Sequence, residues 1–357
     1  SMEHKFFKRT LLGAVIAASS IGSANAAVEL AGDAVQFYGQ AAGFMILGDD
    51  TDTQSVGAVI ESRIGFRGVV EFDDFAPNLV WQIEGGDANN GAKSGQLGAR
   101  DTYLGLDFED VGSFKFGRQL VAAYNYVDWP HSNPGLGNVF DWNTDIGVSY
   151  QDRADNTLRF DSASFGGFNF QATLSGMEQD TDRMVSSIAA SYSKDMFSVH
   201  AGYYARGEYE AAGDELPKYI IDENDNVIAN PDYVAGGELE TKYAHNYAIL
   251  GGSVFLGDLT LTAAYKAMET DTYTGTQGQN AISATAQYVL DGKWVFKGGY
   301  ASTDDADGTT DTGDIALTAR LGYLLPSTYM YTDLRNYKMN NADDWSSYIL
   351  IGTEYYF

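Results

Sequence analysis

The stretch GFNFQATLSG (residues 167–176) alternates apolar and polar side chains one by one along its length. An extended strand would place the apolar residues on one face (Phe168, Phe170, Ala172 and Leu174) and the polar residues on the other (Asn169, Gln171 and Thr173). The stretch also has about the ten residues that a tilted strand needs to cross a bilayer. It therefore predicts a β-strand with one face for an apolar environment and one face for water.

The same pattern recurs along almost the whole chain after residue 27. It is clear in LTLTAAYK (259–266), AISATAQY (281–288) and DIALTARLGY (314–323), and it continues into the final stretch, SYILIGTEYYF (347–357). About sixteen such segments can be counted, starting near residues 34, 58, 78, 98, 111, 147, 166, 183, 196, 243, 258, 280, 293, 314, 328 and 345. An even number of antiparallel strands can close into a barrel, which leaves no strand edge unpaired in lipid.

The connections between these segments are of two kinds. Some are short turns, such as Asp291-Gly292, and others are long and acidic, the longest being Glu208–Lys242. Short turns on one side and long loops on the other are typical of outer-membrane barrels. Aromatic residues stand near strand ends, as in the interfacial girdles of such barrels (Trp81, Trp294, Tyr323, Trp345 and Tyr355). A soluble β-sandwich or jelly roll is the alternative, but it does not explain charged residues on the polar faces of so many strands. The sequence predicts an all-β transmembrane antiparallel barrel.

The first 26 residues are expected to be a signal peptide. A positive region (Lys5, Lys8 and Arg9) precedes the short apolar run Leu11–Ala18, and Ser23–Ala26 ends in a small-x-small cleavage pattern. Ser1, which precedes Met2, is expected not to belong to the natural chain. The remaining residues, 27–357, are expected to form a single barrel domain. No window of the sequence approaches a transmembrane helix.

The composition is strongly acidic and contains no cysteine. The formal charge is −27, and removing three basic residues and one acidic residue with the signal peptide would make it −29. Nucleic acid is therefore a poor partner, whereas cations and cationic solutes are plausible ones. No cofactor motif or metal-ligand cluster appears, so no cofactor and no metal are expected.

Four stretches resemble the general porins of Gram-negative outer membranes. They are SRIGFRG (62–68), LGLDFEDVGSFKFGRQ (104–119), RADNTLRFDSASFGGFNFQA (153–172) and the terminal Phe357. The resemblance implies sixteen-stranded homotrimers whose protomers each hold a water-filled pore. It also implies a third long loop that folds into the lumen, here about residues 119–147, and an assembly machinery that reads Phe357.

The resemblance also implies a cluster of arginines on the pore wall. Arg63, Arg100 and Arg153 match its positions. Arg67 and Arg159 alternate with apolar residues on the same strands as Arg63 and Arg153. A charge on the lipid face at mid-membrane depth costs roughly 2–4 kcal/mol, so these side chains are expected inside. They are expected both to line the pore and to hold the wall together by ion pairs, and pore lining is favoured for Arg63, Arg100 and Arg153.

The expected inner loop departs from the family pattern. Members often carry a Pro-Glu-Phe-Gly-Gly stretch there, whereas this chain reads YVDWPHSNPGLGNVFDWNTD (126–145). The carboxylates available to face the arginines are Asp128, Asp141 and Asp145. Trp129 and Trp142 either pack the loop onto the wall or offer a stacking surface to a sugar ring.

The expected function is passive diffusion of small hydrophilic solutes and ions across the outer membrane, with a mild preference for cations. The surrounding lipid, including lipopolysaccharide, is the expected environment. An enzyme is disfavoured, because His131, His200 and His245 lie in no catalytic motif. Two alternatives remain: a porin specific for maltodextrin or chitooligosaccharide, and an adhesin or phage receptor that uses the loop 208–242.

Overall fold

The computed structural model describes residues 27–50, 53–88, 96–142, 144–340 and 342–357. The predicted signal peptide, residues 1–26, lies outside the described residues. Among the described residues, no helix is long and apolar enough to cross a membrane.

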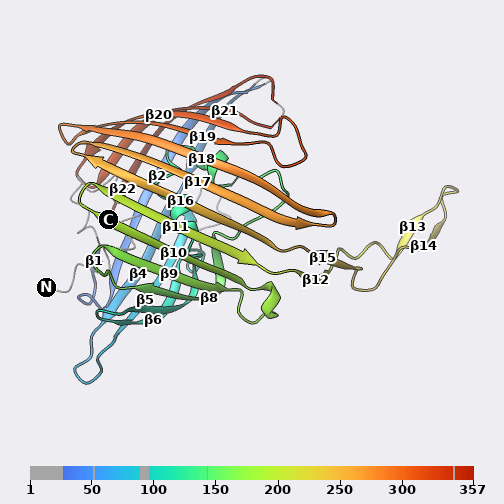
Figure 1. Cartoon of the computed structure of the whole chain (residues 1–357), viewed down its shortest axis with the longest axis horizontal. Coiled ribbons are helices and arrows are strands. Elements are labelled where there is room, and N and C mark those ends of the chain that lie inside the picture. The colour runs from blue at the N-terminus through green and yellow to red at the C-terminus, as the bar shows by residue number, and fades with distance from the viewer. Residues whose placement is uncertain (1–26, 51–52, 89–95, 143, 341) are drawn as a thin grey trace.

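Sixteen antiparallel strands close into one barrel (Figure 1), which confirms the predicted fold class. One of the sixteen is interrupted at Glu61, and both of its parts, β3 and β4, pair with β2. The short β1 (Val28–Glu29) adds a further pair to β2. The barrel strands are β2 (Gln36–Asp50), β3 (Thr53–Ile60) with β4 (Ser62–Val70), β5 (Asn78–Ala88), β6 (Thr102–Phe108), β7 (Gly112–Leu120), β8 (Arg153–Ser162), β9 (Phe168–Ser175), β10 (Val185–Lys194), β11 (Phe197–Arg206), β16 (His245–Leu256), β17 (Leu259–Thr272), β18 (Gly275–Leu290), β19 (Trp294–Thr303), β20 (Ile315–Leu325), β21 (Thr328–Lys338) and β22 (Ser346–Tyr356).

The barrel closes where the final strand β22 pairs with β2. The register runs from Gln40 opposite Tyr356 to Asp49 opposite Ser347. Phe357 continues this seam, because its backbone N–H and C=O both bond to Gly39, at 3.0 and 2.8 Å. The chain end is therefore fixed in the sheet.

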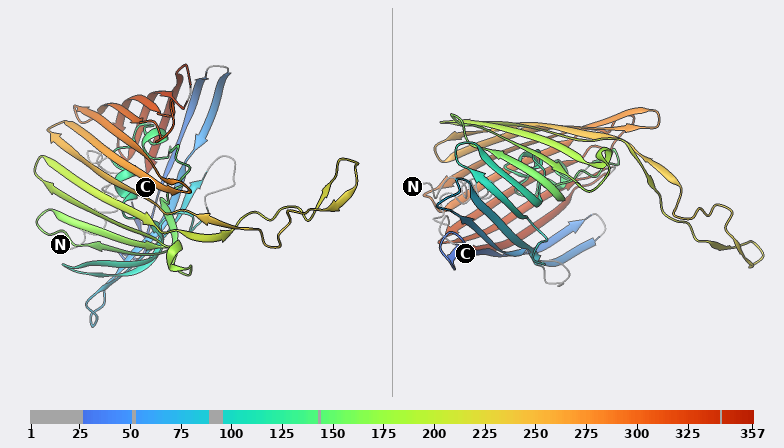
Figure 2. Two further views of the ribbon diagram at one scale, coloured as in Figure 1. Left: turned by 45° about the vertical axis from the view of Figure 1, so that its right-hand side comes forward. Right: turned by 90° about the horizontal axis from the view of Figure 1, so that it is seen from below.

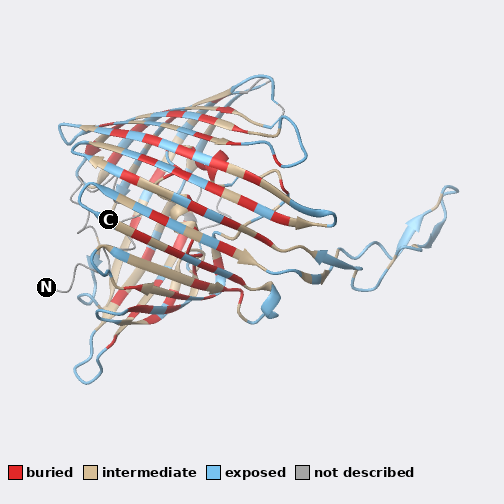
Figure 3. Ribbon diagram, viewed as in Figure 1, coloured by how far each residue is buried: buried red, intermediate tan, exposed pale blue. Residues whose placement is uncertain are grey.

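Burial along the strands is the reverse of that in a soluble protein (Figure 3). On β18, Ile282 and Tyr288 are 42% and 44% exposed, whereas Ser283 and Gln287 between them are 2% and 9% exposed. Successive side chains of a strand point to opposite faces. The apolar face is thus the outer, lipid-facing one, and the polar face lines the lumen.

Most strand starts lie within three residues of the predicted ones, and four differ more. β3 starts at Thr53 and not near 58. β8 starts at Arg153 and not near 147, and β6 starts at Thr102 and not near 98. β18 starts at Gly275 and not near 280, because its first residues pair with polar residues at the end of β17, where Asp271 lies opposite Thr276. An all-polar strand end has no alternation that a sequence pattern could detect.

Residues 121–152 connect β7 to β8 and run through the inside of the barrel (Figure 2). This segment, the inner loop, contains the short helices α2 (Tyr124–Asp128) and α3 (Gly137–Phe140). Its buried apolar side chains belong to the same core cluster as residues of β10, β11, β16, β17 and β18 (Val121, Val127, Leu136, Val139 and Phe140). It starts two residues later and ends five residues later than the range 119–147.

A long arm leaves the barrel between β11 and β16 and projects away from it (Figures 1 and 2). It contains the hairpin pairs β12 (Tyr209–Ala212) with β15 (Leu239–Lys242), and β13 (Tyr219–Ile221) with β14 (Val227–Ala229). At its root the ring of Tyr209 lies 4.8 Å from the guanidinium carbon of Arg183 and 4.9 Å from that of Arg206.

Candidate functional site: the lumen and its inner loop

The lumen holds a cavity of about 1060 Å³ between the inner loop and the barrel wall. Acidic and basic side chains line it in equal number, eight of each among the described residues. The excess of 27 negative charges in the whole chain therefore lies outside this cavity.

Three glycines of the wall leave room for the inner loop. An added Cβ at Gly202 on β11 would lie 2.9 Å from the Cβ of Ala123, and one at Gly299 on β19 would lie 2.7 Å from Cδ1 of Leu136. An added Cβ at Gly251 on β16 would lie 2.8 Å from Nε2 of His131. These distances are below normal van der Waals contact, so the close fit of the loop depends on glycine at these positions.

Polar side chains of the wall also hold the loop backbone. The N–H groups of Ala122 and Ala123 donate to Thr173 Oγ1 at 3.0 Å and Ser187 Oγ at 2.9 Å. Tyr337 Oη donates to the carbonyl of Gly135 at 2.7 Å. A loop enclosed in a barrel must have its backbone groups satisfied, and these bonds supply part of that requirement.

A pair of histidines joins the loop to the wall at one further point. Nε2 of His131 lies 2.8 Å from Nε2 of His200 on β11, and Ser283 Oγ donates to the carbonyl of His131 at 2.6 Å. Tyr126 stacks on the His200 ring with the ring centres 4.4 Å apart. Burial lowers the pKa of His131 to about 3, and the nearby His200 and Lys297 act in the same direction.

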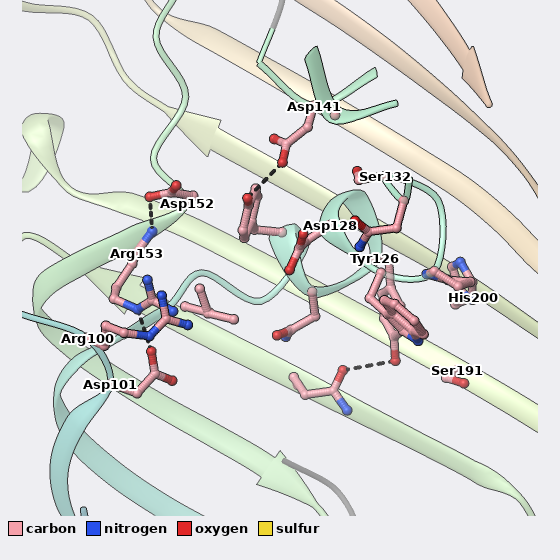
Figure 4. A pocket seen from close by; sticks show the side chains of 18 of the residues that line it. Arg100, Asp101, Tyr126, Asp128, Ser132, Asp141, Asp152, Arg153, Ser191 and His200 are labelled. Atoms are coloured by element: carbon pink, nitrogen blue, oxygen red, sulfur yellow. Dashed lines mark hydrogen bonds and ion pairs between the residues drawn. The ribbon is translucent and has the colours of Figure 1, made fainter. Parts of the chain in front are cut away.

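The three arginines that match the family cluster all line the cavity: Arg63, Arg100 and Arg153. Arg153 Nε lies 2.5 Å from Asp101 Oδ1, and Arg100 Nε lies 2.6 Å from Glu84 Oε1. Figure 4 shows Arg100, Asp101 and Arg153 close together on the wall. Arg63 comes from β4 and lies opposite Gln40 in the strand register.

The two further arginines are in different surroundings. Arg159 lines the cavity and shares Asp161 with Lys115, at 2.9 and 3.1 Å. Arg67 is not among the residues that line the cavity. Its guanidinium carbon lies 4.5 Å from the ring centre of Tyr38.

Asp128 and Asp141 both line the cavity from the loop side (Figure 4). Burial raises the pKa of Asp128, and the positive charges of the wall act against this shift (Arg153, Arg63 and Arg100). Asp141 Oδ2 accepts a hydrogen bond from Tyr124 Oη at 2.8 Å. Burial raises the pKa of Asp141 as well, and the charge of Lys266 opposes this rise. Lys266 Nζ also donates to the carbonyl of Asp141 at 3.1 Å.

Asp145 is not brought to the cavity. Its carboxylate accepts hydrogen bonds from Gln279 Nε2 and Asn340 Nδ2, both at 2.8 Å, so it fastens the loop to β18 and to the segment after β21. Asp152, which the sequence reasoning did not single out, lines the cavity beside Arg153 and accepts a hydrogen bond from its backbone N–H.

The two tryptophans of the loop differ in exposure. Trp142 lines the cavity and is 68% exposed. Trp129 also lines the cavity but is half-buried, and Lys297 Nζ lies 5.6 Å from its ring centre. Of the two, Trp142 offers the more exposed ring to a solute.

A second basic group lines the cavity on β19–β21: Lys297, Arg320 and Arg335. Sequence reasoning missed it as a group. The sequence pattern that could have revealed this group is weak, because Arg320 stands out only as one polar residue of an alternating strand. Among the described residues, no cluster of three or more His, Asp or Glu side chains could hold a metal ion.

Comparison with known proteins adds three observations. The family model described as "Gram-negative porin" matches residues 12–342. A chitoporin of Vibrio furnissii is 35% identical over 329 residues, which cover 85% of this chain and 84% of that protein. Outer membrane porin F of Escherichia coli is 28% identical over 195 residues, 49% of this chain and 52% of that protein.

Solved structures show the same fold at low sequence identity. The OmpF of Salmonella typhi, solved with daunomycin, aligns with a TM-score of 0.66 and 18% identity over 93% of this chain and 100% of that one. The trimer form of OmpT from Vibrio cholerae aligns with a TM-score of 0.64 and 17% identity over 90% of this chain and 99% of that one.

Proposed function

Since the chain belongs to the Gram-negative porin family and forms an outer-membrane β-barrel channel, we propose that it carries small hydrophilic solutes and ions by passive diffusion. Family and fold make it a channel and not an enzyme. No chemical step is needed. The function requires only a wet lumen, a narrowing and a charge arrangement that selects what enters.

One observation carries the proposal: charges of opposite sign face each other across the cavity. Asp128 and Asp141 come from the inner loop, and Arg63, Arg100 and Arg153 come from the wall. The influence of all three arginines on Asp128 indicates that these groups lie within electrostatic reach of one another. Low-dielectric protein on both sides strengthens the field in the water between them. A polar solute can align in this field, whereas an apolar solute would have to displace ordered water.

A mild preference for cations is part of the proposal. The charges that line the cavity are balanced, so the preference has to come from elsewhere in the chain. The arm contributes most: residues 208–242 contain ten acidic and two basic residues. Such a charge raises the local concentration of cations, and salt screens it over a Debye length of about 8 Å at physiological ionic strength.

The experiment is a reversal-potential measurement across a KCl gradient, with the purified, folded protein in a planar lipid bilayer. K⁺ favoured over Cl⁻ is the expected result, and the preference should decrease as total salt rises. Absence of conductance from demonstrably folded protein would refute the channel, while a preference for Cl⁻ would refute only the proposed selectivity.

A homotrimer is proposed as the assembled state. The OmpT structure in trimer form supports it by likeness of fold. The outer surface adds an apolar hollow over β2, β3 and β19–β22, lined by Gly43, Met45, Ala58 and Ile60 among others. Small and apolar residues of this kind suit close packing between protomers. Three equal closing steps in the bilayer recording would be the sign of a trimer.

A chitooligosaccharide channel is the second candidate. It is favoured by the similarity to the Vibrio furnissii chitoporin and by Trp142, whose exposed ring lines the cavity. Aromatic rings can stack on sugar rings. Block of the ion current by chitohexaose, but not by maltohexaose, and its loss in W142A would support this candidate. Equal block by both sugars would argue for general diffusion.

Two interactions with other cell components complete the proposal. Phe357 is proposed as the residue that the outer-membrane assembly machinery reads, and its place at the closing seam suits that role. Lipopolysaccharide is proposed to surround the barrel on the side of the long loops. Deletion of Phe357 should lower the amount of assembled protein in the outer membrane.

A further inference from the structure

The second basic group of the lumen, Lys297, Arg320 and Arg335, comes from three neighbouring strands, β19, β20 and β21. Lys297 on β19 lies opposite Arg320 on β20, and Arg320 lies opposite Asp333 on β21. Arg335 follows two residues later on β21 and so shares the face of Asp333. Lys297, Arg320 and Arg335 all line the cavity. Two strands, β22 and β2, separate β21 from β4, the strand of Arg63.

The two arginines of this group share one carboxylate. Arg320 Nε and Nη2 lie 2.6 and 2.9 Å from the two oxygens of Asp333, and Arg335 Nη2 lies 2.7 Å from Oδ2. The side chain of Asp333 is 0% exposed, while those of Arg320 and Arg335 are 12% and 19% exposed. A solute in the lumen therefore meets the guanidinium groups and not the carboxylate. With Lys297, the group carries two positive charges more than its buried acid neutralises.

Aromatic rings and the inner loop hold these cations in place. The guanidinium carbon of Arg320 lies 3.9 Å from the ring centre of Tyr331. Arg335 contacts the loop so closely that a Cβ added to Gly135 would lie 2.5 Å from its Cδ. Stacked and packed side chains lose little freedom when a ligand binds, which favours binding. Glu354 on β22 also lines the cavity and lies opposite Tyr329 in the register. When Glu354 and Asp333 are both counted against the three cations, the group keeps a net positive charge.

We propose that Lys297, Arg320 and Arg335 form an anion-binding station in the lumen, which takes the carboxylate or phosphate group of a solute in transit. A guanidinium presents its N–H donors in a plane that matches both kinds of oxyanion, and an ammonium adds a movable point charge. The family-type cluster differs in this respect, because Arg100 and Arg153 each have an acid of their own, Glu84 and Asp101. This inference goes beyond diffusion with a cation preference, because it gives acidic solutes a binding site inside a channel whose acidic loops disfavour their entry.

The test measures block of the K⁺ current by two probes, tripolyphosphate and citrate, in wild type and in the double variant K297Q/R335Q. Both substitutions keep Arg320, whose two hydrogen bonds continue to neutralise buried Asp333. The dissociation constant of both probes is expected to rise at least tenfold. K293Q is the matched control, because Lys293 is an exposed lysine in the turn of the same hairpin, and it should leave both constants unchanged.

The single variants K297Q and R335Q are measured beside the double variant, and each should give an intermediate rise. They keep the test decisive if the double variant fails to fold. A rise for one probe only would restrict the station to phosphates or to carboxylates. Equal block of wild type and all three variants would overturn the proposal, as would block that is lost in R100Q/R153Q and kept in K297Q/R335Q.

Discussion

Gly299 and Gly298 offer a sharp test of how the inner loop is held. They are neighbours on β19, so their side-chain positions face opposite sides of the sheet. An added Cβ at Gly299 would lie 2.7 Å from Leu136 Cδ1 and 3.0 Å from Thr318 Oγ1. An added Cβ at Gly298 would have only one atom within reach, the Thr318 carbonyl oxygen at 4.0 Å. We predict that G299A loosens the loop and that G298A does not.

The magnitude follows from this contact. Leu136 is 0% exposed, so it has little room to yield. Forcing a methyl group into such a packed site costs about 1–3 kcal/mol. Each 1.4 kcal/mol makes the undocked loop about ten times more frequent. Both variants gain the same backbone stiffening from Gly to Ala, about 0.4–1 kcal/mol, so their difference isolates the contact.

The assay is single-channel recording of closing events and current noise, together with the temperature at which folded protein unfolds. G299A should raise the frequency of partial closures by about fivefold to about a hundredfold over G298A and wild type. L136A should restore space, so that L136A/G299A is less perturbed than the sum of its single variants. Identical recordings from G298A and G299A, or strict additivity in the double variant, would refute the reasoning.

Three further outcomes are expected. D128N should reduce the preference for K⁺ in reversal-potential measurements because it removes an acid that feels Arg63, Arg100 and Arg153, whereas D145N should not, since Asp145 lies away from the cavity. Lowering the pH from 7 to 4.5 in a D128N/D141N background should increase partial closures, and H131Q/H200Q should abolish this increase. The pKa of His131 is depressed from 6.5 to about 3, so the stability it gives is complete above pH 6.5 and is lost toward pH 3, by up to about 1.4 kcal/mol per unit. D128N/D141N is used because the raised pKa of both carboxyl groups makes docking less favourable as the pH rises, which opposes the histidine effect. Deleting residues 214–236, which carry six acids and one lysine, should weaken the K⁺ preference and leave the unfolding temperature unchanged.

The fold could be predicted because its signal is local and repeated. Alternation in segments such as 167–176 is visible in any one strand, and the closing partner of β22 follows from the even number of strands. The lining positions of Arg63, Arg100 and Arg153 came from the family resemblance, and alternation agreed with them. The pairing of the strands could therefore be predicted without knowing which residues are in contact.

The rest of the site depends on distances between remote residues. Asp128 and Asp145 look alike in the sequence, yet one faces the cavity and the other binds Gln279 and Asn340. Lys297, Arg320 and Arg335 become neighbours only through the register of three strands. The fit of Leu136 against Gly299 has no sequence signal, because glycine in a strand has many other uses.

The attachment points of the inner loop also bear on the order in which the molecule can be built. Wall residues between 171 and 340 hydrogen-bond to the loop, and they follow the loop in the chain. The seam that closes the barrel joins β22 to β2. The loop can therefore settle on a still open, curved sheet from β9 onward. Inserting the loop into an already closed barrel would require its polar backbone to pass through a narrow opening. We therefore expect the inner loop to dock on the wall before β22 pairs with β2.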